Sequence, residues 1–285
     1  MKKYVLILST FISLNTYAAS NGWKDCDESG TAACEYQIKD GVLTIRGTGE
    51  NGAGTIPDYD DKRDCTLTRY FECTTLAPWR WDEDAETVHT VNIEKGITSI
   101  GADAFEDMQM TSVNLPDGLT SIKSLAFHQC GQLSNINLPD SIETIEDWAL
   151  SPSSINTLKL PSNLETIGYR AFDSVQLKDS FLVIPDSVTS LSENAIYSYN
   201  PQSRLTKLYC SASLMEACEK AAANAGLEVF EYTKDEKGRY AVENNLYLSL
   251  SDMQEGKIFI PKRIYTIDEA NQVAGPKNRV SIKYR

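Results

Sequence analysis

The sequence predicts a β-rich solenoid of about five coils of 22–24 residues, with an N-terminal β cap, a helical closing coil and a small α+β module after it. Two observations lead to this fold. A 13-residue pattern recurs five times in the middle of the chain, and six of the seven cysteines form three pairs, each eight residues apart. A unit this short cannot bury its own apolar side chains, so a core forms only when copies stack.

The first 19 residues have the layout of a secretory signal peptide. Lys2 and Lys3 form a basic start, residues 4–14 are almost wholly apolar, and Ala18 and Ala19 are the small residues of a cleavage site. This apolar run is shorter than the about 20 residues that cross a bilayer. We therefore expect export to the periplasm, cell surface or medium, with no transmembrane segment after signal cleavage.

Residues 20–87 are expected to form a disulfide-stapled N-terminal cap that contains a β-hairpin. Cysteines of exported proteins are commonly oxidised. We predict three local disulfides: Cys26 with Cys34, Cys65 with Cys73, and Cys210 with Cys218. Spacing alone does not prove this connectivity.

The repeat pattern defines the expected solenoid and closing coil, residues 88–232. Its copies are IEKGITSIGADAF (93–105), LPDGLTSIKSLAF (115–127), LPDSIETIEDWAL (138–150), LPSNLETIGYRAF (160–172) and IPDSVTSLSENAI (184–196). Apolar residues occupy the same positions in every copy, and Ala always stands tenth after the proline position. Each copy therefore offers the same inward-facing set to its neighbours.

The local pattern within one coil predicts its secondary structure. Residues alternate in polarity before the proline, as in a short strand, and the proline ends that strand because it cannot donate to a ladder. A second short strand is expected around residues such as Leu119 to Ile122, and a turn of tight helix at the Ala-Phe segment.

These repeats resemble the BspA-like leucine-rich-repeat family. The resemblance extends to GVLTIRGTG (41–49) and APW (77–79), which look like that family's N-terminal cap, and to residues 205–226, which look like its closing coil with a helix. Ser151 to Ser154 departs from the usual turn. The resemblance implies a leucine-rich-repeat solenoid and a secreted or surface protein of adhesion and host contact.

Residues 233–285 lie outside the repeat and are expected to form a separate α+β module. GRYAV and KIFIP are typical of strands, and a helix is expected from about Thr266 to Ala274. A cap on the open end of the solenoid and a docking element with a basic end are both compatible with this segment.

Catalytic and cofactor motifs are weak in this chain, and we predict no enzyme, no cofactor and no metal. Gly47 to Gly52 matches GxGxxG but is followed by Pro57 instead of a helix, so a dinucleotide site is not expected. His128 and Cys130 are two residues apart, and Cys130 occupies a position suited to a buried thiol.

Two acidic runs keep a weak calcium alternative open: Asp58, Asp60 and Asp61, and Asp82 with Asp84. Solvated loops are the simpler interpretation of both. A hydrolase that uses carboxylates alone stays a lesser alternative, since no pair of acids stands out.

The outward-facing side chains of the predicted strands are the candidate binding surface. They change from polar to apolar along the stack, so the predicted ligand-binding residues are Lys159, Phe181, Val183, Lys207 and Tyr209. If the C-terminal module covers that end, substitutions of Phe181 and Tyr209 should destabilise the fold instead of weakening binding. If they change neither property, the Trp148 side of the coil is the next candidate.

The expected function is a secreted binding protein that holds a protein or glycan ligand outside the cytoplasm, in adhesion or host contact. A structural envelope scaffold is the alternative. The net charge of −13 repels phosphate backbones and argues against nucleic acid as a partner. The oligomeric state is not predictable from these features.

Overall fold

The computed structural model describes residues 22–27, 33–59, 77–178, 181–197, 204–242 and 245–258. The chain divides into two compact units, residues 1–233 and 234–285. The predicted signal peptide, the Cys65–Cys73 pair and the predicted helix at 266–274 lie outside the described residues.

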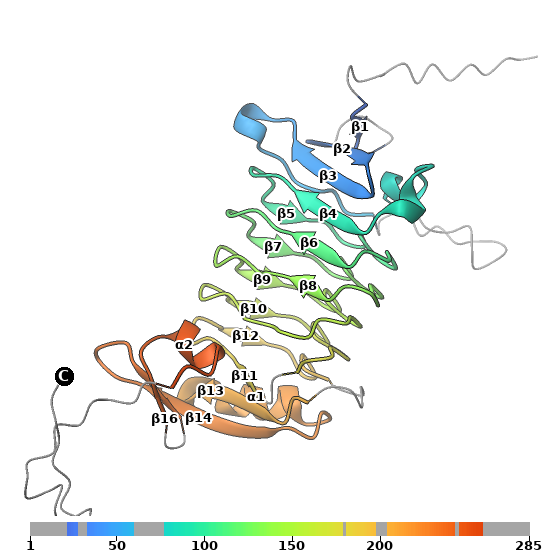
Figure 1. Ribbon diagram of the computed structural model, residues 1–285. Helices are drawn as coiled ribbons and strands as arrows, with labels where there is room; N and C mark the ends of the chain where they lie inside the picture. The colour runs from blue at the N-terminus through green and yellow to red at the C-terminus, as the bar shows by residue number, and fades with distance from the viewer. Residues whose placement is uncertain are drawn as a thin grey trace, which may run out of the picture. The chain divides into compact units, whose positions relative to one another are not determined.

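The first unit is a solenoid whose coils form a sheet on each of two sides, one mixed and one parallel (Figure 1). One sheet contains, in order, β1 (Lys24–Asp25), β2 (Cys34–Lys39), β3 (Val42–Gly47), β4 (Thr90–Ile93), β6 (Ser112–Asn114) and β8 (Asn135–Ile136). The first three strands pair antiparallel, and β3, β4, β6 and β8 pair in parallel.

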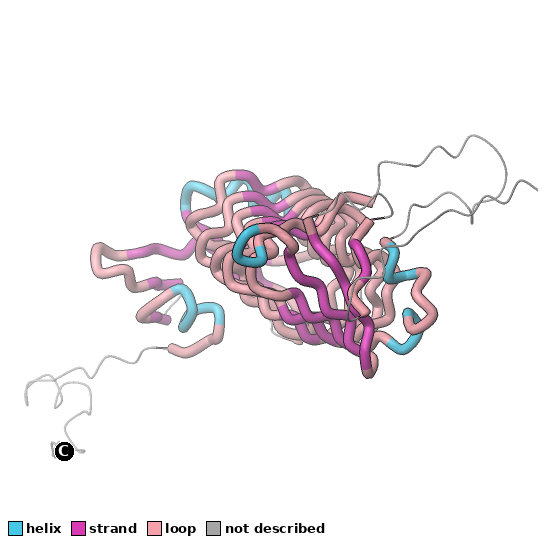
Figure 2. Tube along the Cα trace, turned by 90° about the horizontal axis from the view of Figure 1, so that it is seen from above, coloured by secondary structure: helices cyan, strands magenta, loops and turns pink. Residues whose placement is uncertain are grey.

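The second sheet takes one two-residue strand from each predicted coil. Its strands are β5 (Ser99–Ile100), β7 (Ser121–Ile122), β9 (Thr144–Ile145), β10 (Thr166–Ile167) and β12 (Ser190–Leu191). Equivalent positions of the repeat pair in register, for example Ile100 with Ile122 and Ile122 with Ile145. Seen along the stack, the coils overlie one another (Figure 2).

Stacking buries the predicted inward-facing residues in one continuous core. The five column alanines are fully buried: Ala104, Ala126, Ala149, Ala171 and Ala195. A further buried column comes from the variable link between coils and was not predicted: Met110, Leu133, Ile155 and Leu177. Each coil therefore contributes one more apolar side chain to the core than the repeat pattern indicates.

The Ala-Phe segments are turns, so the expectation of tight helix there is wrong. The residue before each column alanine has a positive φ: Asp103, Leu125, Trp148, Arg170 and Asn194, between 51° and 60°. Such left-handed backbone is uncommon for residues with a side chain and interrupts a helix. It turns the chain, and the position that follows it is a fully buried alanine in every coil.

The N-terminal cap is itself an incomplete coil, which the repeat pattern did not reveal. Strand β3 is in parallel register with β4, and Gly54 forms a parallel bridge with Ile97. Trp79, in the 3₁₀ turn Pro78–Arg80, then stacks on Phe105, with ring centroids 5.4 Å apart. This tryptophan therefore continues the Phe column of the repeats by one position.

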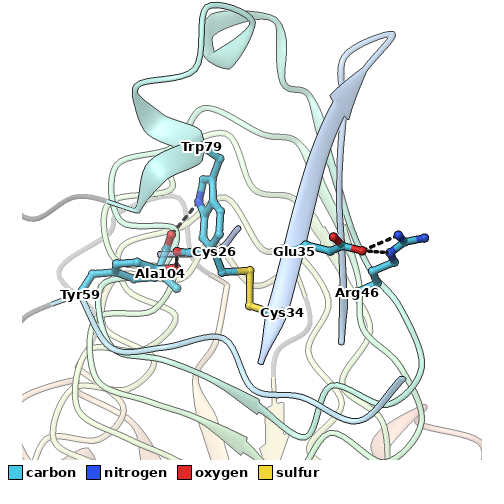
Figure 3. Close-up of a disulfide and its surroundings, with 7 residues drawn as sticks. All are labelled: Cys26, Cys34, Glu35, Arg46, Tyr59, Trp79 and Ala104. Carbon is cyan, nitrogen blue, oxygen red and sulfur yellow. Dashed lines mark hydrogen bonds and ion pairs between the residues drawn. A yellow bond between two sulfur atoms is a disulfide. The ribbon is translucent and has the colours of Figure 1, made fainter. Parts of the chain in front are cut away.

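Trp79 is anchored on several sides (Figure 3). Its indole N–H donates to the Ala104 carbonyl at 3.0 Å, and Tyr36 and Tyr59 meet the ring edge-on, each at 5.5 Å between centroids. The Tyr59 hydroxyl donates to the Cys26 carbonyl at 2.7 Å, beside the Cys26–Cys34 disulfide. One of the predicted staples thus holds the end of the core closed.

Regular strands stop on the first side of the solenoid after β8. Residues 151–160, which contain the departure at Ser151 to Ser154, form no strand. Strand pairing resumes with β11 (Phe181–Val183), parallel to β13 (Lys207–Ser211), which in turn is parallel to β14 (Glu228–Lys234). Between β13 and β14 lie a 3₁₀ turn at Ala212–Leu214 and helix α1 (Met215–Ala222), joined to β13 by the Cys210–Cys218 disulfide.

The second unit contains a small hairpin and a short helix. Strands β15 (Tyr240–Val242) and β16 (Asn245–Tyr247) pair antiparallel, and α2 spans Leu250–Gln254. The predicted strand at GRYAV corresponds to β15. Lys257 and Ile258, the described part of KIFIP, are not in a strand.

Candidate functional site

Aromatic side chains gather on the turn side of the solenoid, where the backbone reverses before each column alanine. Trp148 and Arg170 have the left-handed conformation, with φ of 58° and 51°. Tyr169 precedes Arg170, and His128 and Tyr197 follow the buried residue next to their column alanines. We call His128, Trp148, Tyr169, Arg170 and Tyr197 the aromatic cluster.

The cluster is held together by contacts between coils. Trp148 meets His128 and Tyr169 edge-on, with centroids 5.8 Å and 6.0 Å apart. The Arg170 guanidinium carbon lies 4.9 Å from the Trp148 ring centroid and 4.4 Å from that of Tyr197. Cation–π contacts of this kind stabilise by about 0.5–2 kcal/mol each. Together with the edge-on ring contacts, they join side chains from four coils on one surface.

Polar contacts fix the edges of the aromatic cluster. Arg170 forms an ion pair with Asp173 at 3.3 Å, and His128 Nδ1 lies 3.1 Å from a Glu106 carboxylate oxygen. The Tyr169 backbone N–H donates to Asp147 at 2.6 Å. Because the turns are clamped in this way, the rings keep their positions while remaining in part accessible. Tyr169 is 37% exposed, and the other members are half-buried.

The five sequence-predicted binding residues are only partly accessible. Lys159 is exposed, and Phe181 and Lys207 are half-buried. Val183 is only 1% exposed and Tyr209 only 5% exposed. Neither residue therefore offers an accessible side chain, and a binding role for the group stays a prediction.

Strand β14 supplies the physical reason for this burial. It adds Phe230 directly beside Tyr209, whose ring lies 5.3 Å from that of Phe181 and 5.8 Å from that of Phe230. Tyr232, on the same face of β14, reaches back across β13 and donates its hydroxyl to the Ile184 carbonyl at 3.0 Å. The aromatic side chains at this end of the sheet therefore pack against one another and cover the strand beneath them.

Cys130 is a structural thiol, as predicted. It is fully buried and its Sγ donates to the Phe105 carbonyl at 3.1 Å. Burial raises the pKa of this thiol to about 12, so the reactive thiolate is not formed near neutral pH. The ring of His128 contacts Glu106 and Trp148 instead.

The remaining motifs have structural partners. Gly47 to Gly52 leads from β3 into a 3₁₀ turn, Glu50–Gly52, and the next element among the described residues is another 3₁₀ turn, Pro78–Arg80. Asp58 accepts from the Ala102 N–H and pairs with Lys123 at 2.8 Å, and Asp82 pairs with Lys24 at 2.7 Å. Asp60 and Asp61 lie outside the described residues.

The described part of the chain contains no group of three or more His, Cys, Asp or Glu side chains placed to hold a metal ion. It also contains no helix that is both long and apolar enough to cross a membrane.

Comparison with known proteins identifies the repeats. The family described as "BspA type Leucine rich repeat region" matches residues 83–202 in six copies, one more than the sequence pattern predicted. A search of curated proteins found no significant match.

Two solved structures are similar to this chain, and the first of them shares its fold. A leucine-rich repeat protein from Eubacterium ventriosum is 22% identical with a TM-score of 0.50, and the match covers 78% of this chain and 48% of that one. A leucine rich cell surface protein from Faecalibacterium prausnitzii is 18% identical with a TM-score of 0.39, covering 78% and 61% of the two chains. The chain thus spans about half the length of the Eubacterium protein.

The comparisons and the geometry agree on the architecture. Stacked coils, paired parallel strands and the buried Ala and Phe columns are explained by one repeat type. The two disulfides among the described residues are typical of a location outside the cytoplasm. Residues 83–202 of this chain match a BspA-type leucine-rich repeat region, and their fold is a leucine-rich-repeat solenoid.

Proposed function

We propose that this protein is an exported binding protein that holds a protein partner on the aromatic cluster. The single observation that carries the proposal is that Trp148, Tyr169, Arg170 and Tyr197 come together from three coils on one partly exposed surface. Trp, Tyr and Arg are the residue types that contribute most to protein–protein binding.

The scaffold beneath the cluster suits such a role. The cluster sits on turns whose next residues, Ala149 and Ala171, are fully buried in the core. Its side chains are therefore ordered before binding, and less conformational entropy is lost when a partner docks.

The test is a panel of immobilised extracellular proteins and glycans, probed with the wild-type protein and with the double variant Trp148→Ala, Tyr169→Ala. We expect the wild type to bind a protein of the panel and the double variant to bind it about 30-fold more weakly or worse, since hot-spot truncations cost 2 kcal/mol or more. Melting midpoints measured in parallel check that both proteins are folded.

Trp81→Ala is the matched control. Trp81 is 69% exposed and lies outside the cluster, so its removal tests for a general effect of losing a surface tryptophan. Undiminished binding by the double variant, or an equal loss in Trp81→Ala, contradicts the proposed contact. A protein that binds nothing on the panel, and whose deletion weakens the cell envelope, supports the scaffold alternative.

A further inference from the structure

A polar groove of about 440 Å³ lies in the segments that link the turns to the strands of the first side of the solenoid. Its lining residues are Ser134, Ser154, Asn156, Gln176, Lys178 and Arg204. The volume is within the range of small-ligand sites. We propose that this groove binds a carboxylate-bearing sugar of an acidic glycan, independently of the aromatic cluster.

The groove is built where the coils are irregular. Ser154 and Asn156 belong to the strandless stretch 151–160, and Lys178 belongs to the longest repeat step, of 24 residues between Pro161 and Pro185. Arg204 leads into β13 of the closing coil. The core is built from the regular positions of the repeat. The side chains that line the groove lie outside those positions, so they are not needed for the core and can contact a ligand.

Every lining side chain can hydrogen-bond. The two serine hydroxyls donate to backbone carbonyls, Ser154 to Gly131 at 2.5 Å and Ser134 to Thr111 at 3.4 Å, which leaves their lone pairs free to accept from a ligand. The amides of Asn156 and Gln176 can both donate and accept. No aromatic or aliphatic residue lines the groove, although the carbon stems of its side chains supply more of the lining surface than their nitrogen and oxygen atoms. The hydrogen-bonding ends of these side chains are therefore what would recognise a polyhydroxylated ligand.

The two cations call for an anionic group on that ligand. Within the described residues, the side chains of Lys178 and Arg204 form no ion pair, although the chain has a net charge of −13. Their backbones are fixed: the Lys178 N–H donates to Asn156 at 2.9 Å and the Arg204 N–H donates to Leu177 at 2.8 Å. The backbone at both exposed cations is thus held in place by hydrogen bonds. An arginine at such a position can bind a carboxylate through two parallel hydrogen bonds.

The spacing of the coils also suits a chain of sugars. Stacked strands are roughly 4.8 Å apart, so successive coils present polar side chains at short, repeated intervals along the solenoid axis. Because the acidic surface repels anions at long range, binding must depend on this local pair of cations and on hydroxyl recognition together.

The test uses calorimetric titration of the full-length protein with a hyaluronan tetrasaccharide, which alternates glucuronic acid with N-acetylglucosamine. The N-acetylglucosamine tetramer, which lacks carboxylates, and a tetraglutamate peptide, which lacks sugar hydroxyls, are the comparison ligands. We expect the hyaluronan fragment to bind about tenfold more tightly than either one.

Arg204→Gln and Lys178→Gln should each weaken hyaluronan binding about tenfold, because each removes a charge-assisted hydrogen bond. Both residues are exposed, so the fold tolerates these changes. Lys39→Gln, at the exposed end of β2, makes the same change in net charge away from the groove and should leave binding unchanged.

Four results overturn the inference. They are failure of the hyaluronan fragment to bind, equal binding of the neutral tetramer, equal or tighter binding of tetraglutamate, and an equal loss of affinity in Lys39→Gln. None of these results bears on the aromatic cluster, whose variants leave the groove intact.

Discussion

The position of Cys130 in the repeat holds side chains of different size in different coils. The equivalent position holds Met108, Ser153 and Val175 in the other coils, and all four side chains are buried. The slot therefore accepts side chains of different volume, whereas the neighbouring column holds a fully buried alanine in all five coils.

The burial of Cys130 predicts its reactivity. At pH 8, iodoacetamide should leave this thiol unmodified in the folded protein and modify it quickly in denaturant, since burial holds the pKa at about 12 and only the thiolate reacts. Peptide mapping by mass spectrometry measures the labelling of Cys130 separately from other cysteines. Rapid labelling of the native protein at this peptide would be inconsistent with the packing described here.

At the scale of the element, strand β14 decides what the C-terminal end of the solenoid presents. The sequence correctly places Leu182 in the core and Phe181 and Val183 on the opposite face of β11. It does not show that β14 continues the sheet and lays Phe230 and Tyr232 against that face. A predicted outward position is therefore not the same as an exposed position.

Tyr209 should accordingly act on stability. Tyr209→Ala removes a ring that packs between Phe181 and Phe230, so we expect a loss of about 3 kcal/mol in the free energy of unfolding. Tyr209→Phe keeps the ring and is the control, with a much smaller expected loss. Chemical denaturation curves of both variants measure the difference, and an unchanged midpoint for Tyr209→Ala would argue that the ring is accessible after all.

Sequence patterns predicted most of the features that repeat, apart from the column of Met110, Leu133, Ile155 and Leu177 and the Ala-Phe turns, and they missed most of those that occur once. The inward columns, the alanines and the Cys26–Cys34 and Cys210–Cys218 pairs follow from periodicity and spacing. Trp79 in the Phe column, the aromatic cluster and the polar groove depend on which distant segments become neighbours. Trp148 alone gave a signal, as a large side chain at a turn, but its partners Arg170 and Tyr197 become apparent only when the coils are stacked.

At the scale of the whole solenoid, stability comes from contacts between neighbouring coils. Each coil buries its apolar side chains only against the coils before and after it. The Cys26–Cys34 disulfide with Trp79 closes the core at one end, and β13 with α1 closes it at the other. Disruption of one inner coil should therefore destabilise the coils next to it, because each of them would lose the neighbour that covers its apolar side chains.

Leu138→Asp tests this cooperativity. Leu138 is 7% exposed within the core, between the coils that carry Leu115 and Leu160. A carboxylate there has no partner in an apolar site, and its burial costs several kcal/mol, enough to unfold a marginally stable domain. We expect the variant to lose its cooperative thermal transition, measured by circular dichroism. Asn137→Asp adds the same charge one residue earlier, at an exposed position, and should melt near the wild-type midpoint. A cooperative transition in Leu138→Asp close to that midpoint would mean that the inward register of the repeats is incorrect, since only an outward-facing position accepts the charge so easily.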